Sequence, residues 1–158
     1  MAEGEEKFFA DSMLGRLTLW MRIAGWDVVY EKAIGDAELV RRAKTEGRVI
    51  LTRDTLLIKR RWARDNHFFV RNDDPREQIK EVFSAYKIGR DRFLTRCVRC
   101  NLPLEGVEKE SVRESVPPYV YSTQECFSRC PSCKRIYWAG THRENMEKEM
   151  ERIGGEGS

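Results

Sequence analysis

The stretch Phe8-Phe9-Ala10-Asp11 is the first example of the pattern that indicates the fold, a short apolar run that ends at an aspartate. The pattern returns three times, at Val28-Val29-Tyr30 before Asp36, at Val49-Ile50-Leu51 before Asp54, and at Phe68-Phe69-Val70 before Asp73 and Asp74. Helix-like segments separate the runs, so the runs are expected to be parallel strands. The carboxyl ends of such strands face one crevice, where α/β proteins place their ligands.

The alternation of strands and helices continues through the first half of the chain. Strands are predicted at residues 7–10, 26–30, 48–51 and 67–70. Helices are predicted at residues 13–24, 36–46, 55–63 and 75–86, with Asp36 capping the second and Pro75 in the first turn of the fourth. Four β-α units in a row imply right-handed crossovers and a mostly parallel sheet covered by helices on both faces. We therefore assign residues 7–88 to one α/β domain.

The acidic residues of this crevice are expected to bind a metal. Asp11 and Asp54 leave the first and third strands, which can be neighbours in a doubly wound sheet, so both could reach one ion. Asp36 and Glu38 begin the second helix, where one could complete the site while the other caps the helix or complements its dipole. Carboxylates that share a crevice repel each other unless a cation lies between them. The set therefore predicts a hard divalent metal.

Asp73 and Asp74 precede Pro75, where a turn or a helix cap is the commonest explanation, and both stay candidates for a fourth metal ligand. Other chemistries that place acids at strand ends fit less well. A receiver domain needs an acidic pair after its first strand, and a haloacid-dehalogenase-like phosphatase needs Asp-x-Asp there, but this chain has Asp11-Ser12-Met13. A phosphate-binding P-loop and a GxGxxG turn are both missing from the sequence, so those forms of nucleotide binding have no support.

Charged residues are abundant and unevenly placed. The 158 residues include 29 Lys and Arg against 26 Asp and Glu, for a net charge of +3. This small excess does not by itself indicate nucleic-acid binding. A basic run around and after Asp54 consists of Arg53, Lys59, Arg60, Arg61 and Arg64. The run is either the solvated face of a helix or a surface that faces phosphates.

The N-terminus and the hydropathy pattern indicate a cytoplasmic protein with no membrane partner. The first residues are acidic, no apolar segment follows that could act as a signal peptide, and no stretch reaches transmembrane length. In that compartment cysteines stay reduced. The five cysteines are therefore expected to be metal ligands rather than disulfides.

Two CxxC motifs, Cys97-Val98-Arg99-Cys100 and Cys130-Pro131-Ser132-Cys133, form the strongest motif in the chain. Four thiolates suit tetrahedral Zn²⁺, and four protein ligands leave no position for a reacting water, so the predicted zinc is structural. Cys126 could replace Cys130 as a ligand, but the Cys-Pro-x-Cys form favours Cys130, and Cys126 is expected to be a small core residue. We predict a zinc ribbon at residues 94–142, followed at 143–158 by a polar helix and a disordered tail.

Four segments together resemble one known family. They are residues 9–17, the Leu-Thr-Arg-Asp run at 51–54, the Arg-Cys-Val-Arg-Cys-Asn run at 96–101, and the Tyr-Trp-Ala-Gly-Thr-His run at 137–142. Through them nearly the whole chain is similar to the Mut7-C RNase domain family. The resemblance implies a PIN-like nuclease fold with a C-terminal zinc ribbon and a ribonuclease activity that depends on Mg²⁺ or Mn²⁺. It also implies that Asp11, Asp36 and Asp54 are acidic residues of that site, with Asp73 and Asp74 competing as the fourth.

On this interpretation RNA is the substrate. The basic side chains expected to contact its phosphates are Arg16, Arg53, Lys59, Arg60 and Arg61. Tyr119, Tyr121 and Trp138 either stack on bases or form the small core of the ribbon, and the core is expected for Trp138. Two alternatives stay open, a non-catalytic RNA-binding zinc-ribbon protein and a toxin-like or assembly protein that acts through a protein partner. A homodimer also stays open.

Overall fold

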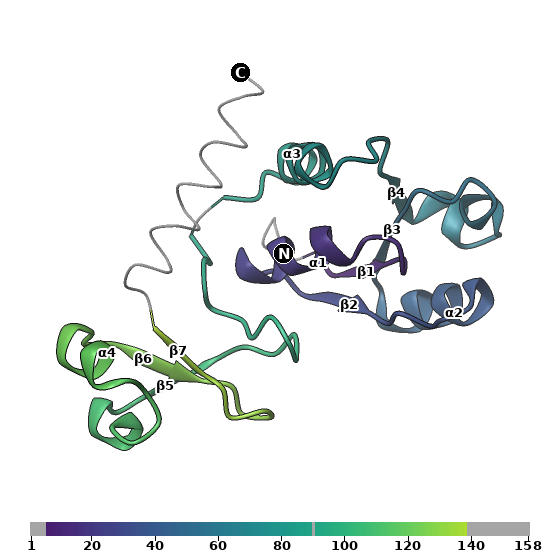
Figure 1. Cartoon of the computed structure of the whole chain (residues 1–158). Coiled ribbons are helices and arrows are strands. Elements are labelled where there is room, and N and C mark those ends of the chain that lie inside the picture. Colours follow the sequence, from purple (N-terminus) through teal and green to yellow (C-terminus); the bar gives the residue numbers. More distant parts are fainter. Residues whose placement is uncertain (1–5, 90, 139–158) are drawn as a thin grey trace.

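The computed structural model describes residues 6–89 and 91–138, and its first part is built on a four-stranded parallel sheet (Figure 1). The strands are β1 (Phe8–Ala10), β2 (Val28–Tyr30), β3 (Val49–Thr52) and β4 (His67–Phe69), in the order β2-β1-β3-β4. Every neighbouring pair is parallel. The chain passes from β1 to β2 and then returns to the other side of β1, so the strand order reverses between β1 and β3. The carboxyl ends of these two strands are the topological switch point, where open α/β sheets bind ligands.

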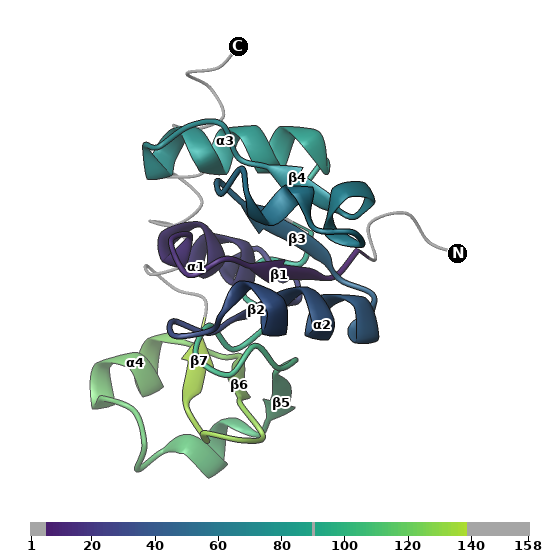
Figure 2. The same ribbon diagram turned by 90° about the vertical axis from the view of Figure 1, so that its right-hand side faces the viewer.

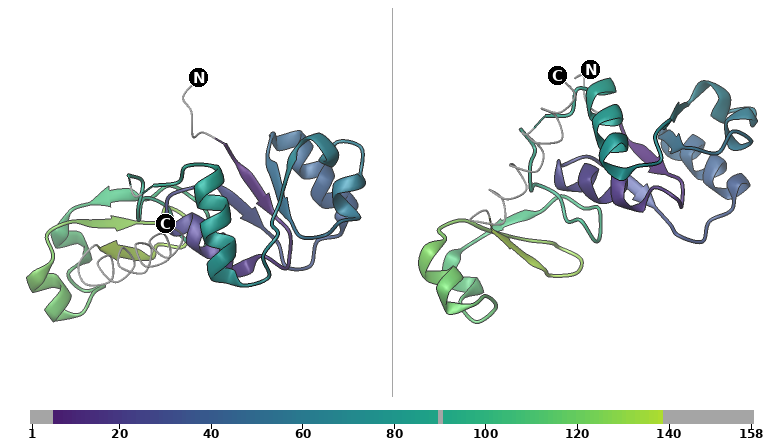
Figure 3. Two further views of the ribbon diagram at one scale, coloured as in Figure 1. Left: turned by 90° about the horizontal axis from the view of Figure 1, so that it is seen from above. Right: turned by 45° about the horizontal axis from the view of Figure 1, so that its top comes forward.

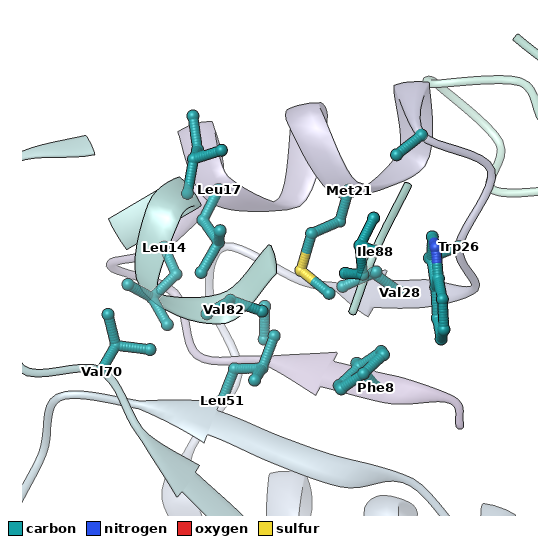
Figure 4. Close-up of a cluster of buried hydrophobic side chains, with 13 residues drawn as sticks. Phe8, Leu14, Leu17, Met21, Trp26, Val28, Leu51, Val70, Val82 and Ile88 are labelled. Atoms are coloured by element: carbon teal, nitrogen blue, oxygen red, sulfur yellow. The ribbon is translucent and has the colours of Figure 1, made fainter. Parts of the chain in front are cut away.

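Helices cover both faces of the sheet, as predicted. α1 (Gly15–Ile23) and α3 (Pro75–Ala85) pack on one face and α2 (Asp36–Glu46) on the other (Figure 1). Phe8 and Leu51 enter the core beneath α1 and α3, whereas Phe9 and Ile50 pack beneath α2. Figure 4 shows the first of these two cores, with the side chains of α1 pointing onto the strands. Burial on both faces explains why the strands read as continuous apolar runs rather than as alternating ones.

The predicted helix at residues 55–63 is wrong. Two short 3₁₀ helices stand in its place, η1 (Leu57–Lys59) and η2 (Ala63–Asp65), and the backbone of Arg60 is extended between them. Leu57 and Ala63 are both fully buried in the core beneath α2. In one regular α-helix these two side chains, six positions apart, would point about 120° away from each other. The break at Arg60 lets both of them reach the same core.

The other predicted elements of this domain begin and end within two residues of the observed ones. The prediction that Asp36 caps α2 is wrong, because Gly35 is the N-cap residue and Asp36 is the first residue of the helix. Asp74 does cap α3, since its carboxylate accepts a hydrogen bond from the N–H of Arg76. Within the described residues, no helix is long and apolar enough to cross a membrane.

The second part of the chain is the cysteine region, residues 94–138, which Figure 3 shows beside the α/β domain. Its antiparallel strands are β5 (Glu105–Val107), β6 (Phe127–Arg129) and β7 (Ile136–Trp138), and the β5–β6 connection carries η3 (Lys109–Val112) and α4 (Pro118–Thr123). Val112, Val116 and Phe127 form a small core, against which Trp138 packs as expected. Cys126 was expected in this core but is exposed. Phe127 fills the core from the next position, and successive residues of an extended chain point to opposite sides.

The connection between the two parts passes close to the end of α1. The N–H of Leu94 donates to the carbonyl oxygen of Ile23 at 2.8 Å, and the Arg92 guanidinium lies 4.7 Å from the centre of the Trp26 ring. Gly25 permits this approach, since a Cβ there would lie 2.2 Å from the carbonyl oxygen of Arg92. The helix and tail predicted at 143–158, and residues 139–142 of the predicted ribbon, lie outside the described residues.

Candidate functional site

Asp11 and Asp54 are linked through one buried hydroxyl at the switch point of the sheet. Asp11 follows β1 and is 4% exposed. Its Oδ1 accepts the N–H of Ser12 at 2.8 Å, and its Oδ2 accepts the hydroxyl of Thr52 at 2.7 Å. Thr52 ends β3, and its Oγ1 in turn accepts the N–H of Asp54 at 2.9 Å. The two strands, which a doubly wound sheet allows to be neighbours, are adjacent, and Thr52 joins the two acids that follow them.

Asp36 brings a third carboxylate to this place from the start of α2. Partial burial and the negative charges of Asp54 and Asp11 raise the pKa of Asp36 above its ordinary value of 3.8. The positive charge of Arg60 acts in the opposite direction on the same pKa, so Arg60 also lies within electrostatic range. A helix N-terminus favours the charged form of a carboxylate. The raised pKa reflects burial first and then repulsion by Asp54 and Asp11, so the three acids contribute to one negative site.

Glu38, the alternative to Asp36, is paired elsewhere. Its two carboxylate oxygens accept hydrogen bonds from the guanidinium of Arg41 at 2.7 and 2.5 Å on the exposed side of α2. These hydrogen bonds lower the pKa of Glu38. The structure therefore brings Asp36, and not Glu38, together with Asp11 and Asp54.

Asp73 and Asp74 lie on the exposed connection between β4 and α3. The Asp74 carboxylate accepts the N–H of Arg76 at 2.8 Å and so begins the helix. Glu81 holds the same connection by accepting the N–H of Arg71 at 2.9 Å. The capping role that the sequence suggested here is therefore the role of Asp74, and a part for Asp73 as a fourth ligand stays a prediction.

The turn that carries Asp11 is held in place from β2. The hydroxyl of Tyr30 donates to the carbonyl oxygen of Ser12 at 2.7 Å. The same ring lies against Gly15, where an added Cβ would be 3.2 Å from the Tyr30 oxygen. Sequence reasoning missed both Tyr30 and Thr52. Thr52 lies between the apolar run 49–51 and the charged pair Arg53-Asp54, and this position of a hydroxyl at the end of a strand was the signal that could have revealed it.

The predicted phosphate-binding residues occupy two environments. Arg16, Lys59, Arg60 and Arg61 are exposed. Arg53 is half-buried, and one of its terminal nitrogens donates to the carbonyl oxygen of Arg71 at 3.0 Å. The Nε of Arg53 is buried and has no hydrogen-bond partner among the described residues. Part of the Arg53 guanidinium thus binds the backbone after β4, whereas the exposed side chains of the other four residues are accessible to a ligand.

The four predicted zinc ligands, Cys97, Cys100, Cys130 and Cys133, form a compact cluster. Within the described ranges this is the only group of three or more potential ligands whose ligand atoms all lie within 4.8 Å of one another. The sulfurs of Cys97 and Cys133 are 3.7 Å apart. A tetrahedron with Zn–S bonds of about 2.3 Å has sulfur–sulfur edges of about 3.8 Å, so the cluster fits Zn²⁺. Cys126 is not a member of the cluster.

Cys97 lies in surroundings that favour its thiolate. Burial opposes ionisation, but the hydroxyl of Tyr137 at 3.2 Å and the N–H of Cys100 at 3.4 Å donate to its sulfur and outweigh burial. The pKa of Cys97 is thereby lowered to about 6. The thiolate is the form of cysteine that binds a metal. Tyr137 is a supporting residue that the CxxC motifs could not reveal, because it lies 40 positions from Cys97.

These observations define a class of protein: an α/β domain with acids at the switch point of a parallel sheet, followed by a four-cysteine centre that fits zinc. The chain matches the Mut7-C RNAse domain over residues 6–150, and it belongs to this family. The family assignment made from the sequence is thus confirmed, and it indicates a ribonuclease-like function. Searches of curated proteins and of solved structures gave no match.

Proposed function

We propose that this protein is a ribonuclease that hydrolyses RNA with a divalent cation, Mg²⁺ or Mn²⁺, held by Asp11, Asp36 and Asp54. The observation that supports the proposal is the position of Asp36, whose pKa is raised by burial and by the negative charges of Asp54 and Asp11. Such a cluster is relieved by a cation that binds between its members. Together with membership of an RNase domain family, this favours a metal-dependent nuclease site.

The acids need not lie as close together as the cysteines do to hold a cation that keeps part of its water. Among the described residues, no three carboxylates come together within 4.8 Å as the cysteines do. Mg²⁺ dehydrates reluctantly and is commonly held by one or two carboxylates, several waters and the phosphate of its substrate. A divalent cation there would supply a bound water of lowered pKa and would offset the negative charge on the scissile phosphate.

The residues of the chain have distinct roles in this proposal. Asp11 and Asp54 are both held in place. Ser12 and Thr52 each donate to one oxygen of Asp11, and the N–H groups of Leu56 and Leu57 donate to Oδ1 of Asp54. A cation competes with the proton of Asp36, and the raised pKa of this carboxyl strengthens that competition. Arg60, within electrostatic range of Asp36, would bind a phosphate of the RNA.

The test is cleavage of a labelled single-stranded RNA by the full chain with and without Mn²⁺. Asp11→Asn and Asp54→Asn should each lower the rate about a hundredfold or more, since metal catalysis contributes several kcal/mol. Asp65→Asn, at an exposed acid on η2, is the matched control and should cut like the parent. Asp36→Asn should lose activity and Glu38→Gln should keep it.

Several outcomes would contradict the proposal. The catalytic assignment is wrong if Asp11→Asn and Asp54→Asn cut as fast as the parent. If no form cuts RNA but all bind it with an affinity that falls steeply with salt, the chain is a non-catalytic RNA-binding protein. A mild chelator should stop cleavage while zinc is still bound at the cysteines. Cleavage that survives the loss of all divalent cations except zinc would exclude Mg²⁺ and Mn²⁺ as cofactors.

A further inference from the structure

The two CxxC turns have the same backbone geometry, and each ends in a residue with a left-handed backbone. Asn101 follows the first turn with a φ of 60°, and Lys134 follows the second with a φ of 66°. The N–H of Asn101 donates to the carbonyl oxygen of Cys97 at 2.8 Å, and that of Lys134 to the carbonyl oxygen of Cys130 at 3.0 Å. The two positions are therefore equivalent in these backbone features, and they differ in side chain and in what that side chain contacts.

The side chain of Asn101 contacts the outer edge of the parallel sheet. Its Oδ1 accepts the N–H of Val28 at 3.0 Å, and its Nδ2 donates to Oδ1 of Asp27 at 2.7 Å. β2 is an edge strand, paired with β1 on one side. Asn101 thus occupies a place where a further strand would otherwise pair. Figure 2 shows the cysteine region on the side of the sheet where β2 lies.

Arg22 makes a second connection between the same partners. Its Nε donates to the carbonyl oxygen of Val28, and one of its terminal nitrogens donates to the carbonyl oxygen of Val98, both at 2.9 Å. Val98 lies inside the first CxxC turn. The turn and the edge strand are therefore joined through both the N–H and the carbonyl of Val28.

Asp27 extends this contact to the centre of the sheet. Its carboxylate also accepts a hydrogen bond from Arg48 at 2.7 Å, and Arg48 donates to the carbonyl oxygen of Phe8 in β1 at 3.2 Å. At the other end of β2, Tyr30 holds the carbonyl of Ser12, next to Asp11. One short strand thus lies between the first CxxC turn and the turn that carries a candidate catalytic acid.

We propose that Asn101 is a positioning residue that couples zinc binding at the four cysteines to the order of β2. With the metal bound, the sulfurs of both turns share one ion, and the backbone of Asn101 is held where its amide reaches Val28 and Asp27. Without the metal the first turn loosens, the amide leaves the edge strand, and β2 becomes less ordered. The inference rests on the fit of the cysteine cluster to Zn²⁺ and not on the proposed ribonuclease activity.

The experiment compares two glycine variants at the equivalent positions, Asn101→Gly and Lys134→Gly. Glycine tolerates a positive φ, so each variant keeps the left-handed backbone and removes only the side chain. The readout is the hydrogen-exchange rate of the Val28 amide, measured by NMR on the full chain with zinc and after chelation. The amide of Ile50, which donates to Asn66 in the centre of the sheet, is the internal reference.

In the parent and in Lys134→Gly, removal of zinc should speed exchange at Val28 about tenfold or more relative to Ile50. In Asn101→Gly the exchange should already be fast with zinc bound, and chelation should change it little. Coupling is reciprocal, so the zinc affinity of Asn101→Gly should also fall, by at most the factor by which zinc slows exchange at Val28 in the parent. A chromophoric chelator in competition measures this affinity, and Lys134→Gly should leave it unchanged.

The inference fails if chelation does not change exchange at Val28 in the parent. It also fails if chelation speeds that exchange equally in Asn101→Gly and in the parent, because the coupling would then not pass through Asn101. Arg22→Met removes the second connection and should also reduce the response of Val28 to zinc. It gives an independent test should Asn101→Gly fold poorly. Since no readout is cleavage, the result does not depend on whether the protein cuts RNA.

Discussion

Replacing Thr52 with valine should destabilise the protein far more than the small change in side-chain volume suggests. Valine has nearly the same shape, so the change removes one hydroxyl from a position that is fully buried. That hydroxyl donates to the Asp11 carboxylate at 2.7 Å and accepts the N–H of Asp54 at 2.9 Å. A hydrogen bond to a charged group contributes about 1.5–3 kcal/mol, and an orphaned buried N–H adds to the loss. The free energy of unfolding should therefore fall by about 2–4 kcal/mol.

Thr18→Val is the matched control, since Thr18 is also a buried threonine, at 3% exposure. Its hydroxyl donates to the carbonyl oxygen of Leu14 at 2.8 Å, but that oxygen already accepts the backbone N–H of Thr18 at 3.0 Å. The control should cost about 1 kcal/mol or less, because no buried group loses its last partner. Urea unfolding of the zinc-loaded protein, followed by circular dichroism, measures both differences.

The comparison refutes the reasoning if Thr52→Val and Thr18→Val cost the same. Thr52→Ser sharpens the test, because it keeps the hydroxyl and removes one methyl group. It should recover most of the stability lost in the valine variant. Equal losses in the serine and valine variants would mean that packing, rather than the link between Asp11 and Asp54, is what Thr52 contributes.

Two further changes test the charge and the backbone around the site. The pKa of Asp36 in the folded protein lies above its ordinary value of 3.8, so the folded state binds this proton more tightly than the unfolded state does. The stabilisation by this proton is fully present below pH 3.8 and is lost as the pH rises through the folded pKa. Without divalent cations, Asp36→Asn should therefore raise the urea midpoint of unfolding at pH 7 and leave it unchanged at pH 3.5. A lower midpoint at pH 7 would contradict the repulsion of Asp36 by Asp54 and Asp11. Gly25 has a φ of +93°, and Gly25→Ala would place a Cβ 2.2 Å from the Arg92 carbonyl oxygen. The free energy of unfolding, measured by thermal unfolding, should fall by about 3 kcal/mol or more. Gly47→Ala is the control, since Gly47 has a φ of +67° and nothing lies within 4 Å of the added Cβ. It should lower the free energy of unfolding by about 1–2 kcal/mol. Equal losses in the two variants would show that the contact with Arg92 is unimportant.

Much of the fold could be predicted because it depends on local patterns. Each of the signals used spans only a few residues. They are apolar runs of strand length, helix periodicity, Gly47 after α2 and Pro75 at the start of α3. The paired CxxC motifs predicted the cysteine cluster for the same reason, since each turn presents two sulfurs from one short segment. The prediction failed at residues 55–63, where two buried anchors, Leu57 and Ala63, override the local helical pattern.

The acids of the candidate site were predicted from the sequence, but long-range contacts in the structure determine how they are held. The sequence indicated Asp11 and Asp54, and it favoured Asp36 while leaving Glu38 as the alternative. Their positions differ by only two residues, and it is the pairing of Glu38 with Arg41 that separates them. The catalytic roles of the acids stay predictions that the cleavage assay tests.

Short segments of sequence are enough to specify the α/β class, the acids at the strand ends, the four cysteines that fit zinc and the family, because each of these is a local property. The position of β3 next to β1, which links Asp11 to Asp54 through Thr52, is known only from the folded chain. The same holds for the hydrogen bond between Asn101 and Val28, which are 73 positions apart in the sequence. Hydrogen bonds between such distant residues depend on strand order and on docking, and no local pattern of residues specifies either of these.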